Sequence, residues 1–386
     1  MNELMATAAA FRAQGRSIVD LTDTNFHNHG LRYPDSRLKR HFIDYVDDRG
    51  YRSESRGMQR TRDRLSRWYA FEGDSVDPDR VILTASTSES YSLVFQSLLA
   101  AGDRILLPAP TYPLFEQLCE YARLEPLYYR LQPKRNFAPE FPDVAAGLEA
   151  GAKALVIISP NNPTGSVLST AQLARFDRLA AAYGAFVVSD EVFRGTEREG
   201  MAACAPDRLE KREAEWYRFA GLSKLFASPD LKLAWIIASG VGERRFEALE
   251  LAADTFLNAS TPSQYVASRM LEDGRDIALN IREALSARAA VAGAVLENIT
   301  GVYGGLHLKA FPQPGGIHRV LQIPGTDDER IALDLLEQES VLVHPGYFYG
   351  FPDDGYLVIS TVSKQSVLTE GLDRLAGFMR SLGKAE

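Results

Sequence analysis

The chain has 386 residues, enough for two domains, and its 45% hydrophobic and 24% charged residues are typical of an ordered globular protein. The formal net charge of −8 argues against a surface that binds nucleic acid through its phosphates. Cys119 and Cys204 are the only cysteines, which excludes a disulfide framework and a cysteine-rich metal site and indicates a reducing compartment.

The N-terminal stretch predicts a short amphipathic helix followed by the segment IVDLTDTN. It lacks the apolar core of a signal peptide, and no run in the chain approaches the roughly 18 apolar residues of a membrane span. We therefore expect a cytoplasmic protein with neither a membrane nor a nucleic acid as partner. His27 and His29 follow, but two histidines without a third ligand do not predict a metal site. A helix is expected next around Met58, Leu65 and Trp68, whose spacing places them on one face.

The following part of the chain alternates short apolar or β-branched runs with helical segments, of which 88–99 and 170–183 are the clearest. Several of the runs are apolar throughout, which is typical of strands in a parallel sheet that is covered on both faces. The pattern predicts an α/β domain with a mostly parallel, doubly covered, seven-stranded sheet. The expected strands are residues 79–86, 103–108, 124–131, 153–160, 184–191, 215–222 and 231–239.

A different pattern begins after residue 254. A long helical stretch, about 262–298 with one interruption near Gly274, precedes four short strand-like runs and an amphipathic helix from about Ser366. This indicates a smaller α+β domain, which we expect the N-terminal segment to join. No Gly/Ser linker is present, so the two domains are expected to pack closely. We place the large domain at residues 45–275 and the small domain at residues 1–44 and 276–386.

Candidate chemistry collects at the carboxyl ends of the expected strands, where open α/β sheets bind their ligands. A turn rich in serine and threonine follows the first strand and opens a helix whose free N–H groups suit a phosphate. Later strands end at an aromatic residue, an amide in a proline-rich turn, a carboxylate and a lysine. Each is common in a structural role, so their convergence is the signal. The residues are Ser86, Thr87, Ser88, Tyr112, Asn162, Asp190 and Lys224.

This set matches the requirements of pyridoxal phosphate: a lysine for the Schiff base, a carboxylate that keeps the pyridine nitrogen protonated, and a helix N-terminus for the phosphate. The motifs SPNNPTG, SDEVF and GLSK, with YRSESRG before them and HPGYFYG after them, are similar to those of class I/II aminotransferases of the fold type I pyridoxal phosphate superfamily. The resemblance covers nearly the whole chain. It implies a homodimer with shared active sites.

The resemblance also implies a role for each residue. Lys224 would form the internal aldimine and move the proton, and Asp190 would pair with the pyridinium. Asn162 would hydrogen-bond the phenolate oxygen of the ring, and Tyr112 would stack on the ring. Tyr51 would reach the phosphate of the neighbouring subunit. The phosphate would lie among Ser86, Thr87, Ser88 and Ser223.

Three departures from the family pattern concern the cofactor. Lys232 takes the place of a phosphate-binding arginine, which keeps the charge but loses the bidentate fork. Gly221 replaces a serine. Phe193 replaces a tyrosine, so one donor to the phenolate oxygen is missing and a more basic internal aldimine is expected. Phe193 and Lys232 remain in the predicted cofactor pocket.

A fourth departure concerns the substrate. The family motif after PGxxF carries an arginine that binds the α-carboxylate, and Val358 takes its place here. Either another cation substitutes, or the amino donor presents its carboxylate differently. The sequence does not rank the candidate cations, which are His29, Arg32, Arg319 and Lys364. A bacterial branch similar to this chain shares its LKLxW and YLVxS variants, so the loss is compatible with activity.

The sequence thus predicts a pyridoxal phosphate-dependent aminotransferase that moves an amino group from an amino acid to a 2-oxo acid through the Lys224 internal aldimine. The alternative is another pyridoxal phosphate reaction on an amino acid, such as elimination, replacement, cyclisation or oxidation, because these reactions use the same residues. A cofactor-binding sensor is a third interpretation. We expect no added DNA-binding domain, since the resemblance begins within the first few dozen residues.

Overall fold

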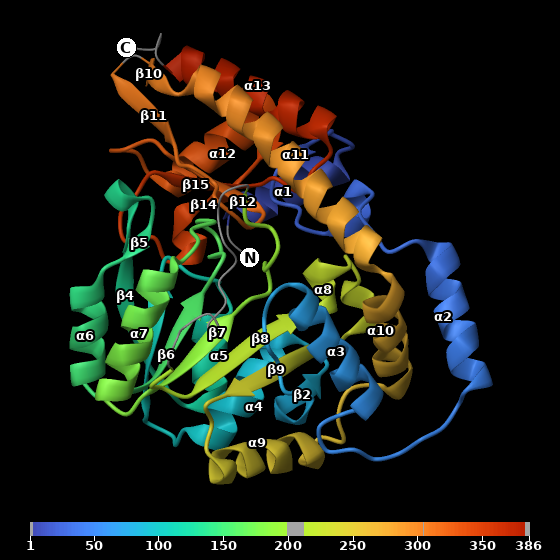
Figure 1. Cartoon of the computed structure of the whole chain (residues 1–386). Helices are drawn as coiled ribbons and strands as arrows, with labels where there is room; N and C mark the ends of the chain where they lie inside the picture. Colours follow the sequence, from blue (N-terminus) through green and yellow to red (C-terminus); the bar gives the residue numbers. More distant parts are fainter. Residues whose placement is uncertain (1–2, 199–211, 304, 383–386) are drawn as a thin grey trace.

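The computed structural model describes residues 3–198, 212–303 and 305–382. Two main sheets organise them, an eight-stranded sheet in the lower half of Figure 1 and a five-stranded sheet above it. Cys119 is a buried free thiol, whereas Cys204 lies outside the described residues.

The large sheet confirms the predicted α/β architecture. Its strands are β2 (Val81–Thr84), β3 (Arg104–Ala109), β4 (Glu125–Gln132), β5 (Ala138–Pro139), β6 (Ala152–Ile158), β7 (Phe186–Asp190), β8 (Trp216–Gly221) and β9 (Ala234–Ser239). They lie in the order β2-β9-β8-β7-β6-β3-β4-β5, and the pairs from β8 to β4 are parallel. β9 is antiparallel to both neighbours. The short antiparallel edge strand β5 was not among the seven predicted strands.

Helices cover both faces of this sheet (Figure 1). On one face pack α4 (Thr87–Leu98), α5 (Phe115–Ala122) and α9 (Glu243–Thr255). On the other pack α3 (Gln59–Phe71), α6 (Phe141–Glu149), α7 (Thr170–Ala182) and α10 (Thr261–Asp273). Successive side chains of a strand point to opposite faces. In β6, Val156 and Ile158 therefore join the first cluster, and Leu155 and Ile157 join the second.

The small domain packs helices on one face of an antiparallel sheet. Its elements are α1 (Glu3–Ala13), α11 (Arg275–Ile299), β10 (Gly301–Tyr303), β11 (Leu306–Ala310), β12 (His318–Gln322), α12 (Asp328–Glu339), β13 (Val341–Leu342), β14 (His344–Pro345), β15 (Tyr356–Ser360) and α13 (Gln365–Leu382). The five-stranded sheet has the order β10-β11-β12-β15-β14. β1 (Val19–Asp20) pairs in parallel with β13, which brings the N-terminal segment into this domain.

The hydrophobic cores of the two domains share elements across the expected domain boundaries. α11 starts among large-domain core residues such as Ile281 and ends among small-domain core residues such as Leu296, and Figure 1 shows it running from α10 to the upper sheet. Phe26 packs in the same core cluster as Ile281, and α2 (Asp35–Asp47) lies beside α10. The division at residues 45 and 275 stays a prediction, since α11 bridges both cores.

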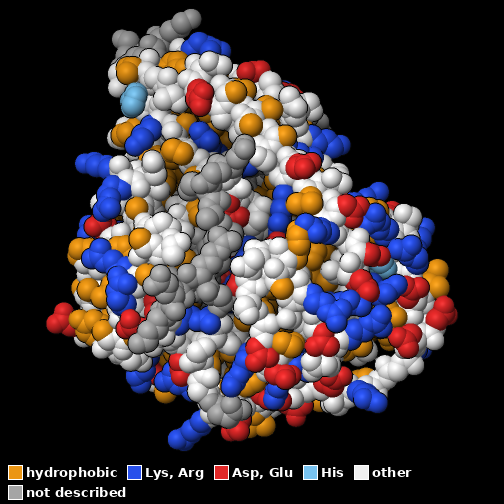
Figure 2. All heavy atoms as spheres, viewed as in Figure 1, with side chains coloured by type: hydrophobic (Ala, Val, Ile, Leu, Met, Phe, Trp, Pro, Cys, Tyr) orange, Lys and Arg blue, Asp and Glu red, His pale blue; other side chains and the backbone are white. Residues whose placement is uncertain are grey.

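The surface carries basic and acidic side chains intermixed on the face drawn in Figure 2. Around α2, α3 and α10 many of the basic residues pair with acidic residues, as in Arg64 with Glu272 and Arg269 with Asp44. Such pairing leaves little net positive potential for a phosphate backbone. Within the described ranges, no helix is long and apolar enough to cross a bilayer.

Candidate active site

A cavity of about 430 Å³ lies where the carboxyl ends of the parallel strands of the large sheet meet the small domain. It brings together every predicted pocket residue except Tyr51 and Lys232. Those residues are Ser86, Thr87, Ser88, Tyr112, Asn162, Asp190, Phe193, Ser223 and Lys224. Polar side chains that the sequence analysis did not select also line the cavity. They are Thr22, Thr24, Tyr91, His318, His344 and Tyr349.

Lys224 lies on α8 (Leu222–Leu225), the single helical turn that follows β8. Its Nζ is 3.5 Å from the backbone oxygen of Thr24 and 4.7 Å from the centre of the Phe26 ring. Burial lowers the pKa of Lys224 to about 8, and the charge of Asp23 opposes that shift. A lysine amine with a depressed pKa and weak partners is suited to act as a nucleophile and as a base.

Asp190 ends β7 and is buried. Its carboxylate accepts hydrogen bonds from Tyr91 Oη at 2.8 Å and from the backbone N–H of Val192 at 2.9 Å. Burial raises the pKa of Asp190 to about 6 despite these two bonds, which act in the opposite direction. A buried carboxylate whose described partners are neutral is incompletely compensated. A protonated pyridine nitrogen in the cavity would supply the missing positive charge.

Tyr91 is a site residue that the sequence analysis missed. It lies one turn after Ser88 in α4, and its ring contacts Phe219 and Phe115 edge-on, with centroids 4.8 and 5.0 Å away. These contacts direct its hydroxyl to Asp190. Helical spacing was the available signal, because positions three and four apart share a helix face.

Asn162 lies in the turn that follows β6. The neighbouring Asn161 holds this turn, since its side-chain oxygen accepts hydrogen bonds from the Thr164 backbone N–H at 3.2 Å and hydroxyl at 2.8 Å. The side-chain oxygen of Asn162 itself is buried and has no hydrogen-bond partner among the described residues. Buried polar atoms without partners are rare in proteins, so this amide fits a polar ligand group in the cavity.

The first turn of α4 supplies the predicted anion site. Ser86 caps the helix by accepting a hydrogen bond from the Glu89 backbone N–H at 3.1 Å. Ser86, Thr87 and Ser88 all line the cavity, and Ser223 lines it from the start of α8. Helix N-termini carry partial positive charge and free N–H groups, which suits a phosphate.

Two predicted pocket residues lie outside the cavity of the single chain. Lys232 has an exposed side chain and a left-handed backbone with φ of 47°, so its position does not support the expected phosphate contact. Tyr51 is 73% exposed, which leaves its expected contact with a neighbouring subunit a prediction.

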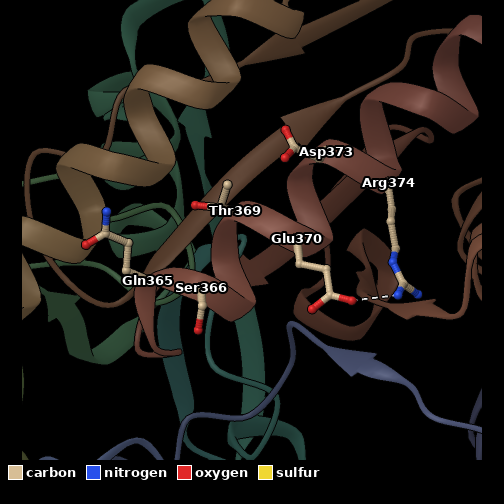
Figure 3. A pocket seen from close by; sticks show the side chains of 6 residues that line it. All are labelled: Gln365, Ser366, Thr369, Glu370, Asp373 and Arg374. Carbon is tan, nitrogen blue, oxygen red and sulfur yellow. Dashed lines mark hydrogen bonds and ion pairs between the residues drawn. The ribbon is translucent and has the colours of Figure 1, made fainter.

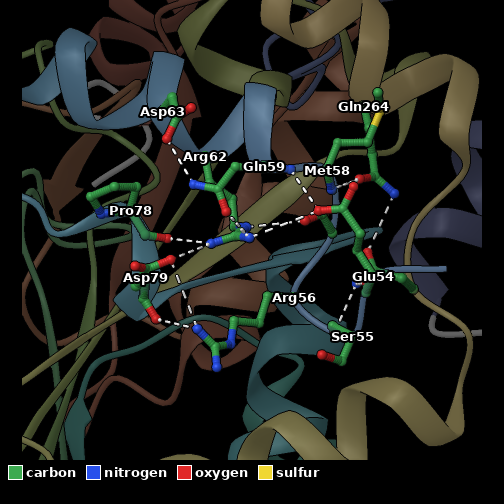
Figure 4. Close-up of polar contacts among 12 residues, drawn as sticks. Glu54, Ser55, Arg56, Met58, Gln59, Arg62, Asp63, Pro78, Asp79 and Gln264 are labelled. Carbon is green, nitrogen blue, oxygen red and sulfur yellow. Dashed lines mark hydrogen bonds and ion pairs between the residues drawn. The ribbon is translucent and has the colours of Figure 1, made fainter. Parts of the chain in front are cut away.

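The chain is anchored a few residues after Tyr51 by the polar cluster drawn in Figure 4. Arg62 of α3 donates hydrogen bonds to the backbone oxygens of Gly57 at 3.0 Å and Pro78 at 2.7 Å, and it lies 3.3 Å from Asp79. Because Arg62 is buried, these bonds hold the segment firmly against the large domain. Tyr51 is therefore exposed although the chain a few residues after it is held in place.

The four cations proposed for the substrate carboxylate are all absent from the cavity lining. His29 lies 3.2 Å from Asp23, and Arg32 lies 3.7 Å from Asp35 on the surface. Lys364 is exposed, and Arg319 belongs to β12 without lining the cavity. Within residues 276–386 the polar side chains of the lining are His318, His344 and Tyr349, and the N-terminal segment adds Thr22 and Thr24.

Other hollows in the described residues lack comparable chemistry. The hollow in Figure 3 is formed by the polar surface of α13, where Glu370 and Arg374 pair at 2.6 Å. An i, i+4 pair of this kind is an ordinary feature of a solvated helix. The part of the chain that the structure describes contains no cluster of three or more His, Cys, Asp or Glu residues suited to a metal ion.

A mostly parallel sheet with a lysine, a buried carboxylate, an amide whose oxygen has no partner and a helix N-terminus around one cavity defines a fold type I pyridoxal phosphate enzyme. The family "Aminotransferase class I and II" matches residues 49–375. The chain belongs to this family and is a pyridoxal phosphate-dependent aminotransferase that transfers an amino group between an amino acid and a 2-oxo acid.

Curated relatives named as aminotransferases align with this chain over nearly their whole length. The chain is similar to the alanine aminotransferase of Mycobacterium tuberculosis, with 29% identity over 97% of this chain and 88% of the relative. It is 25% identical to the glutamate-pyruvate aminotransferase AlaA of Escherichia coli K12, over 97% of this chain and 94% of the relative.

A solved structure confirms the fold. The alanine aminotransferase from Pyrococcus furiosus superposes on this chain with a TM-score of 0.89 at 24% identity. The superposition covers 98% of this chain and 96% of the Pyrococcus chain.

Proposed function

We propose that Lys224 is the residue that binds pyridoxal phosphate covalently and moves the proton during amino transfer. The observation that carries this proposal is that Lys224, Asp190 and Asn162 line one cavity, with the Asn162 side-chain oxygen buried and unpartnered. The bound cofactor supplies an electron-accepting ring that stabilises charge at the substrate α-carbon. Asp190 would hold a proton on the ring nitrogen, since a cation next to it relieves the burial of its carboxylate.

The other lining residues would position the cofactor. Ser86, Thr87, Ser88 and Ser223 would bind the phosphate through hydroxyl and N–H groups of two helix starts. Tyr112 would stack on the ring, and the side-chain N–H of Asn162 would donate to its phenolate oxygen, which leaves the Asn162 side-chain oxygen for a donor group in the cavity. Phe193 lines the same cavity without a hydroxyl, so it would contribute shape alone.

For the substrates we propose an amino donor and a 2-oxo acid acceptor of the kind named for the relatives. Those relatives are named as an alanine aminotransferase and a glutamate-pyruvate aminotransferase. L-alanine with 2-oxoglutarate, and L-glutamate with pyruvate, are therefore the first pairs to test.

The test is the absorbance spectrum of the purified holoprotein before and after single amino acids are added in turn. Conversion of the cofactor to its pyridoxamine form by one donor supports the proposal and identifies that donor. The Lys224→Ala variant is the control and should show neither the lysine-bound absorbance nor turnover. Release of 2-oxo acid and ammonia without the pyridoxamine form would overturn transamination in favour of elimination or oxidation.

We also propose a homodimer in which Tyr51 serves the active site of the partner. α2 supports this, because its apolar residues Phe42, Ile43 and Val46 are 38%, 60% and 62% exposed. Exposed apolar clusters of this kind are typical of interfaces. The near absence of cysteines supports a cytoplasmic location, which cell fractionation can test.

Mixing two inactive variants tests the shared site. In a heterodimer of Lys224→Ala and Tyr51→Ala subunits, one site would have both residues intact, so activity should return on mixing. No return of activity in a sample shown by light scattering to contain heterodimers would contradict the role of Tyr51 across the interface.

A further inference from the structure

The small sheet presents one face to the cavity, and strand register shows which side chains belong to it. β15 lies between β12 and β14. Val358 pairs with Val320 on one side and with His344 on the other, and His318 pairs with Ser360. Paired residues of antiparallel strands share a face, as do residues two apart in one strand. His318 and His344 therefore flank Val358 on the face that lines the cavity.

The same register places Arg319 on the opposite face, so it does not supply a cation for the substrate carboxylate. Arg319 pairs with Ile359, which packs in the small-domain core on the opposite face of the sheet. Lys224 is thus the single Lys or Arg among the described residues that line the cavity. An amino acid bound with its amino group at Lys224 still needs hydrogen-bond donors for its carboxylate.

His318 is the strongest candidate donor. It lines the cavity, is only 6% exposed, and its ring nitrogens have no hydrogen-bond partner among the described residues. The ring nitrogens are not fully enclosed by protein, so they open onto the cavity and can pair with a ligand group there. Burial, followed by the charges of His344 and Lys224, lowers the pKa of His318 to about 3. The free ring is therefore neutral and carries one N–H donor, and an anion beside it would favour the charged form.

His344 lies across β15 from His318 and is oriented by the small domain. Its Nδ1 is 3.1 Å from the hydroxyl of Tyr349, and its ring contacts Phe348 with centroids 5.4 Å apart. Tyr349 in turn contacts the ring of His318 at 6.0 Å. This arrangement fixes the His344 ring and leaves its Nε2 for a second contact.

We propose that His318, with His344 on the other side of Val358, binds the α-carboxylate of the amino-acid substrate at the place where the sequence analysis expected an arginine. The proposal rests on the aminotransferase function proposed above. It makes His318 a specificity-determining residue, since it distinguishes substrates with a carboxylate from amines that lack one.

The test compares His318→Phe, which keeps a ring but removes both nitrogens, with His318→Gln, which keeps an N–H donor. The rate constant kcat/KM is measured for L-alanine and for L-alaninol, or for the amino acid that reacts fastest and the amino alcohol with the same side chain. We expect His318→Phe to lower kcat/KM for the amino acid by about 10-fold to 100-fold, the range for a lost hydrogen bond to a charged group, and to change that for the amino alcohol less than about 3-fold. His318→Gln should recover part of the loss.

Exposed His307 of β11 offers the matched control, because His307→Phe makes the same change on the same sheet away from the cavity. It should leave both rate constants unchanged. Cofactor content and the holoprotein absorbance should also stay unchanged in His318→Phe. Equal losses for the amino acid and the amino alcohol, or no loss for either, would overturn the proposal, and His318→Gln decides it if His318→Phe does not fold.

Acetate separates this proposal from the aminotransferase proposal. Titration of wild-type holoprotein with acetate, followed by cofactor absorbance, measures carboxylate binding without turnover. If no amino acid reacts but acetate binds wild type more tightly than His318→Phe, the substrate proposal fails and the carboxylate site stands. If amino acids react and acetate binds both proteins equally, the carboxylate site alone is wrong.

Discussion

Two groups of buried ionisable side chains meet at the end of β7. Asp190 belongs to one group, and the next residue, Glu191, belongs to the other. Asp190 faces the cavity, whereas Glu191 belongs to an ion cluster with Asp74, Arg194 and Arg218. In the ion cluster, Arg218 Nε lies 2.7 Å from Glu191 and Arg194 Nη1 lies 2.9 Å from Asp74. In the cavity, Asp190 has only neutral described partners and Lys224 has one long contact.

The charges of the ion cluster neutralise one another within the protein, whereas the charges of the cavity lack partners of opposite charge among the described residues. Buried ions that neutralise one another form a closed structural unit, and removing one of them leaves an uncompensated charge. The cavity charges are arranged in the opposite way, because their compensation would come from cofactor and substrate. Variants of the cavity should therefore lose activity without losing stability, whereas variants of the ion cluster should lose stability.

The largest effect is expected for Lys224→Ala. Loss of the proposed cofactor-binding lysine should lower the rate of amino transfer by about 10³-fold or more, while the free energy of unfolding of the cofactor-free protein should not fall, since burial already disfavours the Lys224 charge. Steady-state kinetics and urea unfolding measure the two quantities. Lys153→Ala, which removes an exposed lysine from β6, is the control and should be fully active. Substantial residual turnover in Lys224→Ala would contradict its role.

Arg218→Met should act on stability. Removing the guanidinium leaves Glu191 and Asp74 with reduced compensation, so the free energy of unfolding should fall by about 3–5 kcal/mol. The activity per folded molecule should be kept. Arg245→Met, which breaks an exposed pair with Glu215, is the matched change and should cost less than about 1 kcal/mol. Equal effects of the two variants in urea unfolding would remove the distinction drawn above.

Asp190→Asn should stabilise the cofactor-free protein while abolishing efficient transamination. The pKa of Asp190 is raised to about 6 by burial, so its ionised form destabilises the fold. Wild type therefore loses stability as the pH rises through the range from about 4 to 6, and the variant does not. We expect the variant to be more stable by about 1–3 kcal/mol at pH 7 and equal to wild type near pH 3. Chemical unfolding of the cofactor-free proteins at both pH values measures this, and a destabilised variant at pH 7 would refute it.

The smallest effect is expected for Phe193→Tyr. A hydroxyl at this cavity position adds a donor for the phenolate oxygen of the cofactor, which favours the deprotonated form of the holoprotein. The midpoint of its spectral pH titration should move down by about one pH unit or less. An unchanged or higher midpoint would show that position 193 does not reach that oxygen.

Local pattern determined the large domain and most of its site from the sequence. Apolar runs predicted the strands, and the residues after them, such as Asn162 and Lys224, entered the cavity because the ends of parallel strands meet at one edge. The break between α10 and α11 was predicted at Gly274, where an added Cβ would clash with the Met270 backbone oxygen. One of the four strand-like runs expected after the long helical stretch, VLVHPGYF at residues 341–348, forms β13, β14 and the start of a 3₁₀ helix instead of one strand.

The tertiary structure alone decided the small-domain side of the cavity. His318, His344 and Val358 come together through the pairing of β12, β15 and β14, and such register between distant segments leaves no local signature in a sequence. For the same reason the sequence suggested Arg319, one position along the strand, although the side-chain alternation turns it to the opposite face. The sequence by itself determined the cofactor chemistry, because local motifs carry it. Long-range strand pairing decided which side chains of the small domain line the cavity.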